Sequence, residues 1–170
     1  MRKEKDSLGE KDIEDVYYGI HTARALENFN IKNKRVNEEL IKAIALIKIA
    51  AAEANKKAGK LDENIANAIK EAANDLIVGN YIDAFMLPSI QGGAGTSTNM
   101  CVNEVIANIA LEKMGHKKGD YQIISPLDHV NHSQSTNDVY PTAVKIASIK
   151  LLRELLDETM ALQQELQNKE

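Results

Sequence analysis

The last thirty or so residues constrain the fold of this chain most. After Pro141 no helix-breaking residue occurs before Glu170. Pro141 itself falls in the predicted first turn, where its missing N–H costs no hydrogen bond. At about 1.5 Å per residue, this run predicts a helix on the order of 45 Å long. Its apolar residues form two stripes, Val144, Leu151 and Leu155 on one and Ile149, Leu152 and Leu156 on the other. Such a helix needs packing partners on two sides, so we expect it to join a helical bundle completed by further chain or by other subunits.

Three more helices are predicted upstream, over residues 37–58, 62–78 and 98–114. Asn37 and Asp62 are suitable N-caps, because their short polar side chains accept hydrogen bonds from free amides in the first turn. A glycine follows each of the three segments, as is typical of the left-handed residue that ends a helix. Aromatic residues make up only 4% of the chain, and the rest is rich in helix-favouring types. The sequence therefore predicts a mainly α fold.

The first 35 residues show no sustained hydrophobic period, but a small β-hairpin turning near Gly9 is predicted there. The N-terminus is charged and has no apolar stretch, so we expect no signal peptide. No segment is long and apolar enough to span a bilayer. The formal net charge is −4 without a basic stripe, which argues against nucleic-acid or membrane-surface binding. Cys101 is the single cysteine, so we expect no internal disulfide and a cytoplasmic location.

Two polar segments share one composition. The first polar segment is Gly-Ala-Gly-Thr-Ser-Thr-Asn, residues 93–99, and the second is Ser-Gln-Ser-Thr-Asn-Asp, residues 133–138. Each precedes or begins a predicted helix, where free N–H groups and the helix dipole favour an anion. Hydroxyls and amides add neutral donors, and glycines allow close backbone approach. Two such segments facing each other would suit a small dianion with two carboxylates or phosphates.

The alternative for either segment alone is ordinary helix capping, which requires only one such residue. Other candidate sites are weaker. His129 and His132 with Asp128 have nothing to complete a metal site, so we expect hydrogen-bonding roles for both histidines. Cys101 falls near the start of a predicted helix and is expected to be a packing thiol. No phosphate-binding or dinucleotide-binding glycine motif is present, so no cofactor is predicted.

These segments carry a resemblance to a known family. Residues 92–100 (Gly-Gly-Ala-Gly-Thr-Ser-Thr-Asn-Met) and 133–143 (Ser-Gln-Ser-Thr-Asn-Asp-Val-Tyr-Pro-Thr-Ala) resemble two of the three signature regions of the aspartase/fumarase superfamily. Residues 17–22 (Tyr-Tyr-Gly-Ile-His-Thr) resemble the N-terminal part of aspartate ammonia-lyases. The resemblance covers essentially the whole chain. Within the superfamily, the chain looks more similar to aspartate ammonia-lyases than to fumarases, which usually carry Gly-Thr-Gln-Ser-Asn and Ser-Ser-Asn-Asp at these places. Fumarase and a non-catalytic helical interaction module remain the alternatives.

The resemblance implies an N-terminal helical domain, residues 1–138, followed by the first part of a central bundle helix, residues 139–170. It implies a homotetramer, a dicarboxylate substrate and reversible anti β-elimination of ammonia from L-aspartate to give fumarate. By motif position, Thr96 and the run Ser135, Thr136 and Asn137 would bind substrate carboxylates. The family's catalytic serine loop has no counterpart among these residues. The base is therefore expected beyond Glu170, and the chain alone is expected to be inactive.

Overall fold

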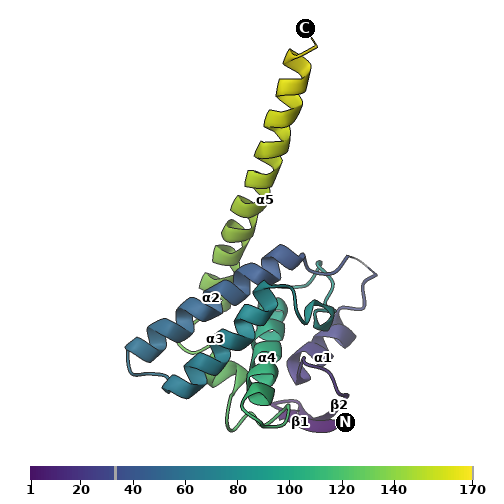
Figure 1. The fold of residues 1–170 in the computed structure, drawn as a ribbon. Helices are drawn as coiled ribbons and strands as arrows, with labels where there is room; N and C mark the ends of the chain where they lie inside the picture. Colours follow the sequence, from purple (N-terminus) through teal and green to yellow (C-terminus); the bar gives the residue numbers. More distant parts are fainter. Residues whose placement is uncertain (33, 170) are drawn as a thin grey trace.

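The computed structural model describes residues 1–32 and 34–169. A body of shorter helices and a small hairpin sits at the base of one long helix, which extends well beyond it (Figure 1). The fold is mainly α, as predicted. The elements are β1 (Arg2–Asp6), β2 (Gly9–Ile13), α1 (Ile20–Asn28), α2 (Glu38–Lys57), α3 (Glu63–Ile77), the 3-10 helix η1 (Ile82–Ala84), α4 (Thr96–Lys113), the π-helix η2 (Pro126–Val130) and α5 (Thr136–Gln167).

The predicted hairpin near Gly9 is confirmed. β1 and β2 pair antiparallel, with Arg2 opposite Ile13 and Asp6 opposite Gly9. Gly9 has a φ of +118°, a conformation that side chains disfavour, so glycine is required at this corner. Ile13, the last residue of β2, is buried, at 2% exposed.

The caps predicted for α2 and α3 are confirmed as well. Asn37 Oδ1 accepts a hydrogen bond from Glu39 N at 2.8 Å, and Asp62 Oδ1 accepts one from Asn64 N at 2.8 Å. Gly59 follows α2 in the left-handed conformation, with φ +67°, and lets the chain turn back into α3. The two helices pack side by side as a helical hairpin (Figure 1).

α4 is the central helix of the body. Every residue from Cys101 to Leu111 is buried, because α1, α3, α5 and η2 all pack against it. The helix begins at Thr96, two residues before the predicted start at Thr98, since Gly95 takes a left-handed φ of +83° as its N-cap. This early start places Thr96 inside the first turn of a helix whose axis runs through the core.

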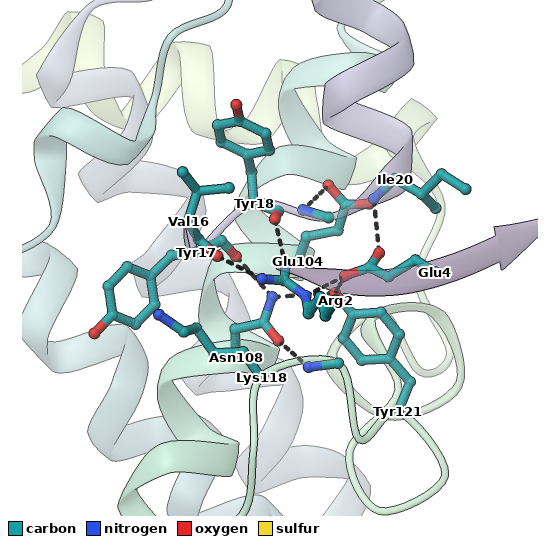
Figure 2. Close-up of polar contacts among 12 residues, drawn as sticks. Arg2, Glu4, Val16, Tyr17, Tyr18, Ile20, Glu104, Asn108, Lys118 and Tyr121 are labelled. Carbon is teal, nitrogen blue, oxygen red and sulfur yellow. Dashed lines mark hydrogen bonds and ion pairs between the residues drawn. The ribbon is translucent and has the colours of Figure 1, made fainter. Parts of the chain in front are cut away.

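α1 was not predicted, because its N-terminus is capped from a distant part of the chain. The Glu104 carboxylate, on α4, accepts hydrogen bonds from Gly19 N at 3.0 Å, His21 N at 2.8 Å and Thr22 N at 3.1 Å. Glu4, on β1, accepts one from Ile20 N at 2.7 Å (Figure 2). Burial raises the pKa of Glu104, while these hydrogen bonds act in the opposite direction. The hairpin, α1 and α4 are thus joined by two carboxylates that satisfy one helix end.

α5 begins at Thr136, so Pro141 lies in its second turn and not in the first turn, where it was predicted. Its first turns pack on the body through Val139, Ala143 and Ala147. Beyond them the apolar residues of both predicted stripes are exposed: Ile149, Leu151, Leu152, Leu155 and Leu156, followed by Met160, Leu162 and Leu166. The division into domains 1–138 and 139–170 stays a prediction. Within the part of the chain that the structure describes, no helix is apolar enough over sufficient length to traverse a bilayer.

Candidate functional site

The structure brings the two polar segments together at the N-termini of α4 and α5. Thr136 Oγ1 accepts a hydrogen bond from Asn99 Nδ2 at 3.1 Å. The Tyr140 ring lies against Gly95, so that a Cβ built at Gly95 would be 2.3 Å from Tyr140 Cδ2. The starts of two helices, distant in sequence, therefore share one polar region in which their positive dipole ends combine.

The first polar segment leaves the start of α4 without a side-chain cap. Gly95 has no side chain to accept the free amides, and the first turn contains no acidic residue. Thr96 is exposed, whereas Thr98 is buried and its Oγ1 accepts a hydrogen bond from Gln91 Nε2 at 3.0 Å. Uncapped amides beside an exposed hydroxyl are the arrangement that binds an external anion.

In the second polar segment the capping interpretation is correct for Ser135. Its Oγ accepts a hydrogen bond from Asn137 N at 3.2 Å, and Asp138 Oδ1 accepts one from Ser135 N at 3.0 Å, which forms a capping box. Ser135 and Asn137 are exposed. Within residues 1–32 and 34–169, the Asn137 side chain has no hydrogen-bond partner, so its amide is free to meet a ligand. Capping therefore explains one residue of this run and leaves Thr136 and Asn137 for another role.

A buried polar network that the sequence did not predict lies beneath both segments. Asn131 Oδ1 accepts hydrogen bonds from Asn99 Nδ2 at 3.2 Å, Asn103 Nδ2 at 3.2 Å and Lys48 Nζ at 2.9 Å. Lys48 also donates to Gln134 Oε1 at 3.0 Å. Burial lowers the pKa of Lys48 to about 7, and the charge of Asp138 opposes this shift. In the sequence, Lys48 stands in the apolar run 41–52, which also contains Lys42.

The histidines make local hydrogen bonds. His129 Nδ1 accepts from Ser125 N at 2.9 Å, and His132 Nδ1 lies 2.8 Å from Asp128 O. Within the described residues, no group of three or more histidine, cysteine or acidic side chains is placed to hold a metal ion. Cys101 is buried, and burial raises the pKa of its thiol to about 12, as suits a packing residue.

Known proteins match this chain over most of its length. A family model described as "Lyase" matches residues 10–170. Aspartate ammonia-lyase of Bacillus subtilis (strain 168) is 58% identical over 156 residues, which is 91% of this chain and 33% of that protein. Aspartate ammonia-lyase of Escherichia coli (strain K12) is 47% identical over 161 residues, or 92% of this chain and 34% of that protein.

Two solved structures share the fold. Fumarate lyase:delta crystallin from Brucella melitensis in native form has a TM-score of 0.86 and 53% identity, covering 88% of this chain and 34% of that one. Recombinant class II fumarase from Schistosoma mansoni has a TM-score of 0.81 and 36% identity, covering 86% of this chain and 31% of that one. The chain spans about a third of the length of the relatives it matches. With the family model matching nearly every residue, this chain belongs to the lyase family of the aspartase/fumarase superfamily.

Proposed function

We propose that the native protein containing this chain is an aspartate ammonia-lyase, which deaminates L-aspartate reversibly to fumarate and ammonia by anti β-elimination. Relatives named aspartate ammonia-lyase are 47% to 58% identical to it over at least nine-tenths of the chain, which favours this reaction over others. The observation that carries the proposal is the contact between Thr136 and Asn99, because it joins two helix N-termini rich in neutral donors.

Thr96, Ser135, Thr136 and Asn137 are the proposed carboxylate-binding residues. Asn99 donates to the Thr136 oxygen, so the Thr136 hydroxyl proton remains available for a ligand oxygen. Ser135 Oγ likewise accepts from a backbone amide and keeps its own proton to donate. These donors carry no charge of their own, so a dicarboxylate supplies the negative charge that the two helix ends favour.

The proposed chemistry needs donors at the place where charge develops. A base removes the C3 proton of aspartate, and the electron pair moves onto the neighbouring carboxylate to give an aci-carboxylate. The C–N bond then breaks, and ammonia departs with the bonding electron pair. Preorganised hydroxyl and amide donors stabilise the aci-carboxylate intermediate more than they stabilise the substrate. We place the base outside these 170 residues. The reaction as proposed uses no organic cofactor.

We propose that the native protein is a homotetramer. The exposed apolar residues of α5, from Ile149 to Leu166, support this part of the proposal. A soluble protein seldom leaves such a long apolar stripe unpaired, and a four-subunit helical bundle would cover it.

The second candidate function is fumarate hydratase, which adds water to fumarate to give malate. The 36% identity to a class II fumarase favours it to a lesser degree. A non-catalytic helical module has less support, since a scaffold has no need of two exposed donor segments at adjoining helix ends.

The test uses the purified native-length protein with L-aspartate and, separately, with L-malate. Fumarate is followed by its ultraviolet absorbance and ammonia by a coupled assay. The proposal expects fumarate and ammonia in equal amounts from aspartate and negligible turnover of malate. Turnover of malate alone would establish the hydratase instead, and no turnover of either substrate would reject both enzymes.

A further inference from the structure

Lys48 is a buried charged residue whose role the proposed carboxylate site does not yet explain. It lies in the middle of α2 and is 0% exposed. Its Nζ donates to two amide oxygens, Asn131 Oδ1 and Gln134 Oε1, and within residues 1–32 and 34–169 it forms no ion pair. A buried ammonium without a paired carboxylate is costly, and a methionine would fill similar space at lower cost. Its hydrogen bonds go to neither Thr96 nor the run from Ser135 to Asn137, so carboxylate binding by those residues does not account for it.

Through Asn131, Lys48 is linked to a cluster of asparagine side chains. Asn131 Oδ1 already accepts from three donors, and the buried Asn99 Oδ1 and Asn103 Oδ1 accept from none within the described residues. The two amide oxygens that Lys48 contacts carry partial negative charge and favour the protonated lysine, whereas burial favours the neutral one. Among the described residues the ammonium is therefore hydrogen-bonded to neutral amides, and Asp138 acts on it through its charge without forming an ion pair.

Two short hydrogen-bonded paths connect Lys48 to the proposed carboxylate-binding residues. Through Asn131 and Asn99 it reaches the Thr136 hydroxyl. It also donates directly to Gln134, the residue that precedes the N-cap Ser135. Asn131 Nδ2 also donates to Gln134 O at 3.1 Å, which ties the two paths together. Removal of Lys48 would therefore take one hydrogen bond from the side chain of Asn131 and one from that of Gln134.

We propose that Lys48 is a positioning residue of the dicarboxylate site, which holds Asn131 and Gln134 beneath the second polar segment and supplies the buried positive charge that a bound carboxylate offsets. This inference rests on the proposed function. Lys48 acts through its amide partners and does not touch the substrate. Its charge is felt at the site because the intervening region is buried or half-buried, where electrostatic interactions are stronger than in water.

The proposal implies that ligand affinity depends on the protonation of Lys48. A dicarboxylate favours the protonated form, so its affinity falls as the pH rises above the lysine's pKa of about 7. The other titratable groups facing this region are Asp138 on α5, whose charge acts on Lys48, and His132 in the preceding loop. The variant His132→Gln separates the histidine from the lysine in a pH profile.

The experiment measures succinate binding to the native-length protein by calorimetry. Lys48→Met removes the charge and both hydrogen bonds. Asn131→Asp keeps the acceptor and adds a carboxylate beside the ammonium, losing only the donation to Gln134 O. Lys42→Met is the matched control, since Lys42 lies on the same helix and pairs with Glu38 at the surface. We expect succinate affinity to fall about tenfold in the first two variants, a typical coupling between adjacent sites, and to stay unchanged in the control.

The pH profile and steady-state kinetics separate this role from simple core packing. We expect the loss of affinity above pH 7 to disappear in Lys48→Met, to move to higher pH in Asn131→Asp and to persist in His132→Gln. The KM for aspartate should rise more than kcat falls. Should Lys48→Met fail to fold, Asn131→Asp decides. If Asn131→Asp bound succinate with the affinity and pH dependence of wild type, the inference would be overturned and the proposed function would stand. If the wild-type protein itself bound no succinate, the proposed function would be rejected.

Discussion

Gly95 and Tyr140 lie in such close contact that no side chain fits between them. A Cβ at Gly95 would be 2.3 Å from Tyr140 Cδ2 and 2.4 Å from Cε2. Since Gly95 is the N-cap of α4 and Tyr140 is in the first turns of α5, this contact fixes the distance between the two helix ends. The shared polar region depends on this approach.

Gly95→Ala should therefore damage the site. The substitution strains a left-handed backbone, with φ +83°, and forces the Tyr140 ring away. We expect a loss of stability of roughly 1–3 kcal/mol and a larger loss of succinate affinity. Gly93→Ala is the matched control, because Gly93 has φ +88° but nothing within 4 Å of a built Cβ. Thermal unfolding of both variants measures the difference, and equal effects would show that the Tyr140 contact is unimportant.

Lys48 should make stability depend on pH in the alkaline range. The unfolded chain keeps this proton up to its ordinary pKa of 10.5, while the folded protein releases it near a pKa of about 7. The unfolded state thus binds more protons between these values, and stability rises with pH there by up to about 1.4 kcal/mol per pH unit. Denaturant unfolding of wild type and Lys48→Met from pH 7 to 10 compares the two slopes. A Lys48→Met slope equal to that of wild type would contradict the assignment.

Ser135 should contribute to helix stability as well as to carboxylate binding. Because its hydroxyl caps α5 through Asn137 N, Ser135→Ala is expected to cost about 1 kcal/mol of stability. Ser135→Asp retains the cap and should restore stability. It also adds a negative charge at the proposed site and should therefore lower succinate affinity further. If Ser135→Asp bound succinate as well as wild type, the anion-binding role of this helix end would be untenable.

The isolated 170-residue chain should have no lyase activity, because the proposed base lies outside it. Incubation with L-aspartate and measurement of fumarate checks this prediction, with the native-length protein as the positive control. Clear turnover by the isolated chain would mean that the base is among these residues.

Local signals in the sequence were sufficient to predict helices whose N-terminal amides are hydrogen-bonded by a neighbouring residue in the sequence. α2 and α3 were predicted because Asn37 and Asp62 cap their own helices. α1 was missed because its cap is Glu104, which follows Thr22 by 82 residues. The role of Lys48 was not predicted, since its hydrogen-bond partners, Asn131 and Gln134, are 83 and 86 residues away. Composition identified the two polar segments, but their contact depends on the packing of α4 against α5.

The most direct test of the dicarboxylate site is the succinate affinity of Asn137→Ala in the native-length protein. Asn137 is exposed and its side chain has no hydrogen-bond partner among residues 1–32 and 34–169, so its removal should leave the melting temperature unchanged. Exposed Asn67→Ala on α3 is the control. If the segment binds a carboxylate, affinity falls by about 1.5–3 kcal/mol, the range for hydrogen bonds to charged groups. Unchanged affinity at unchanged stability would contradict the site and leave the second polar segment as a helix cap alone.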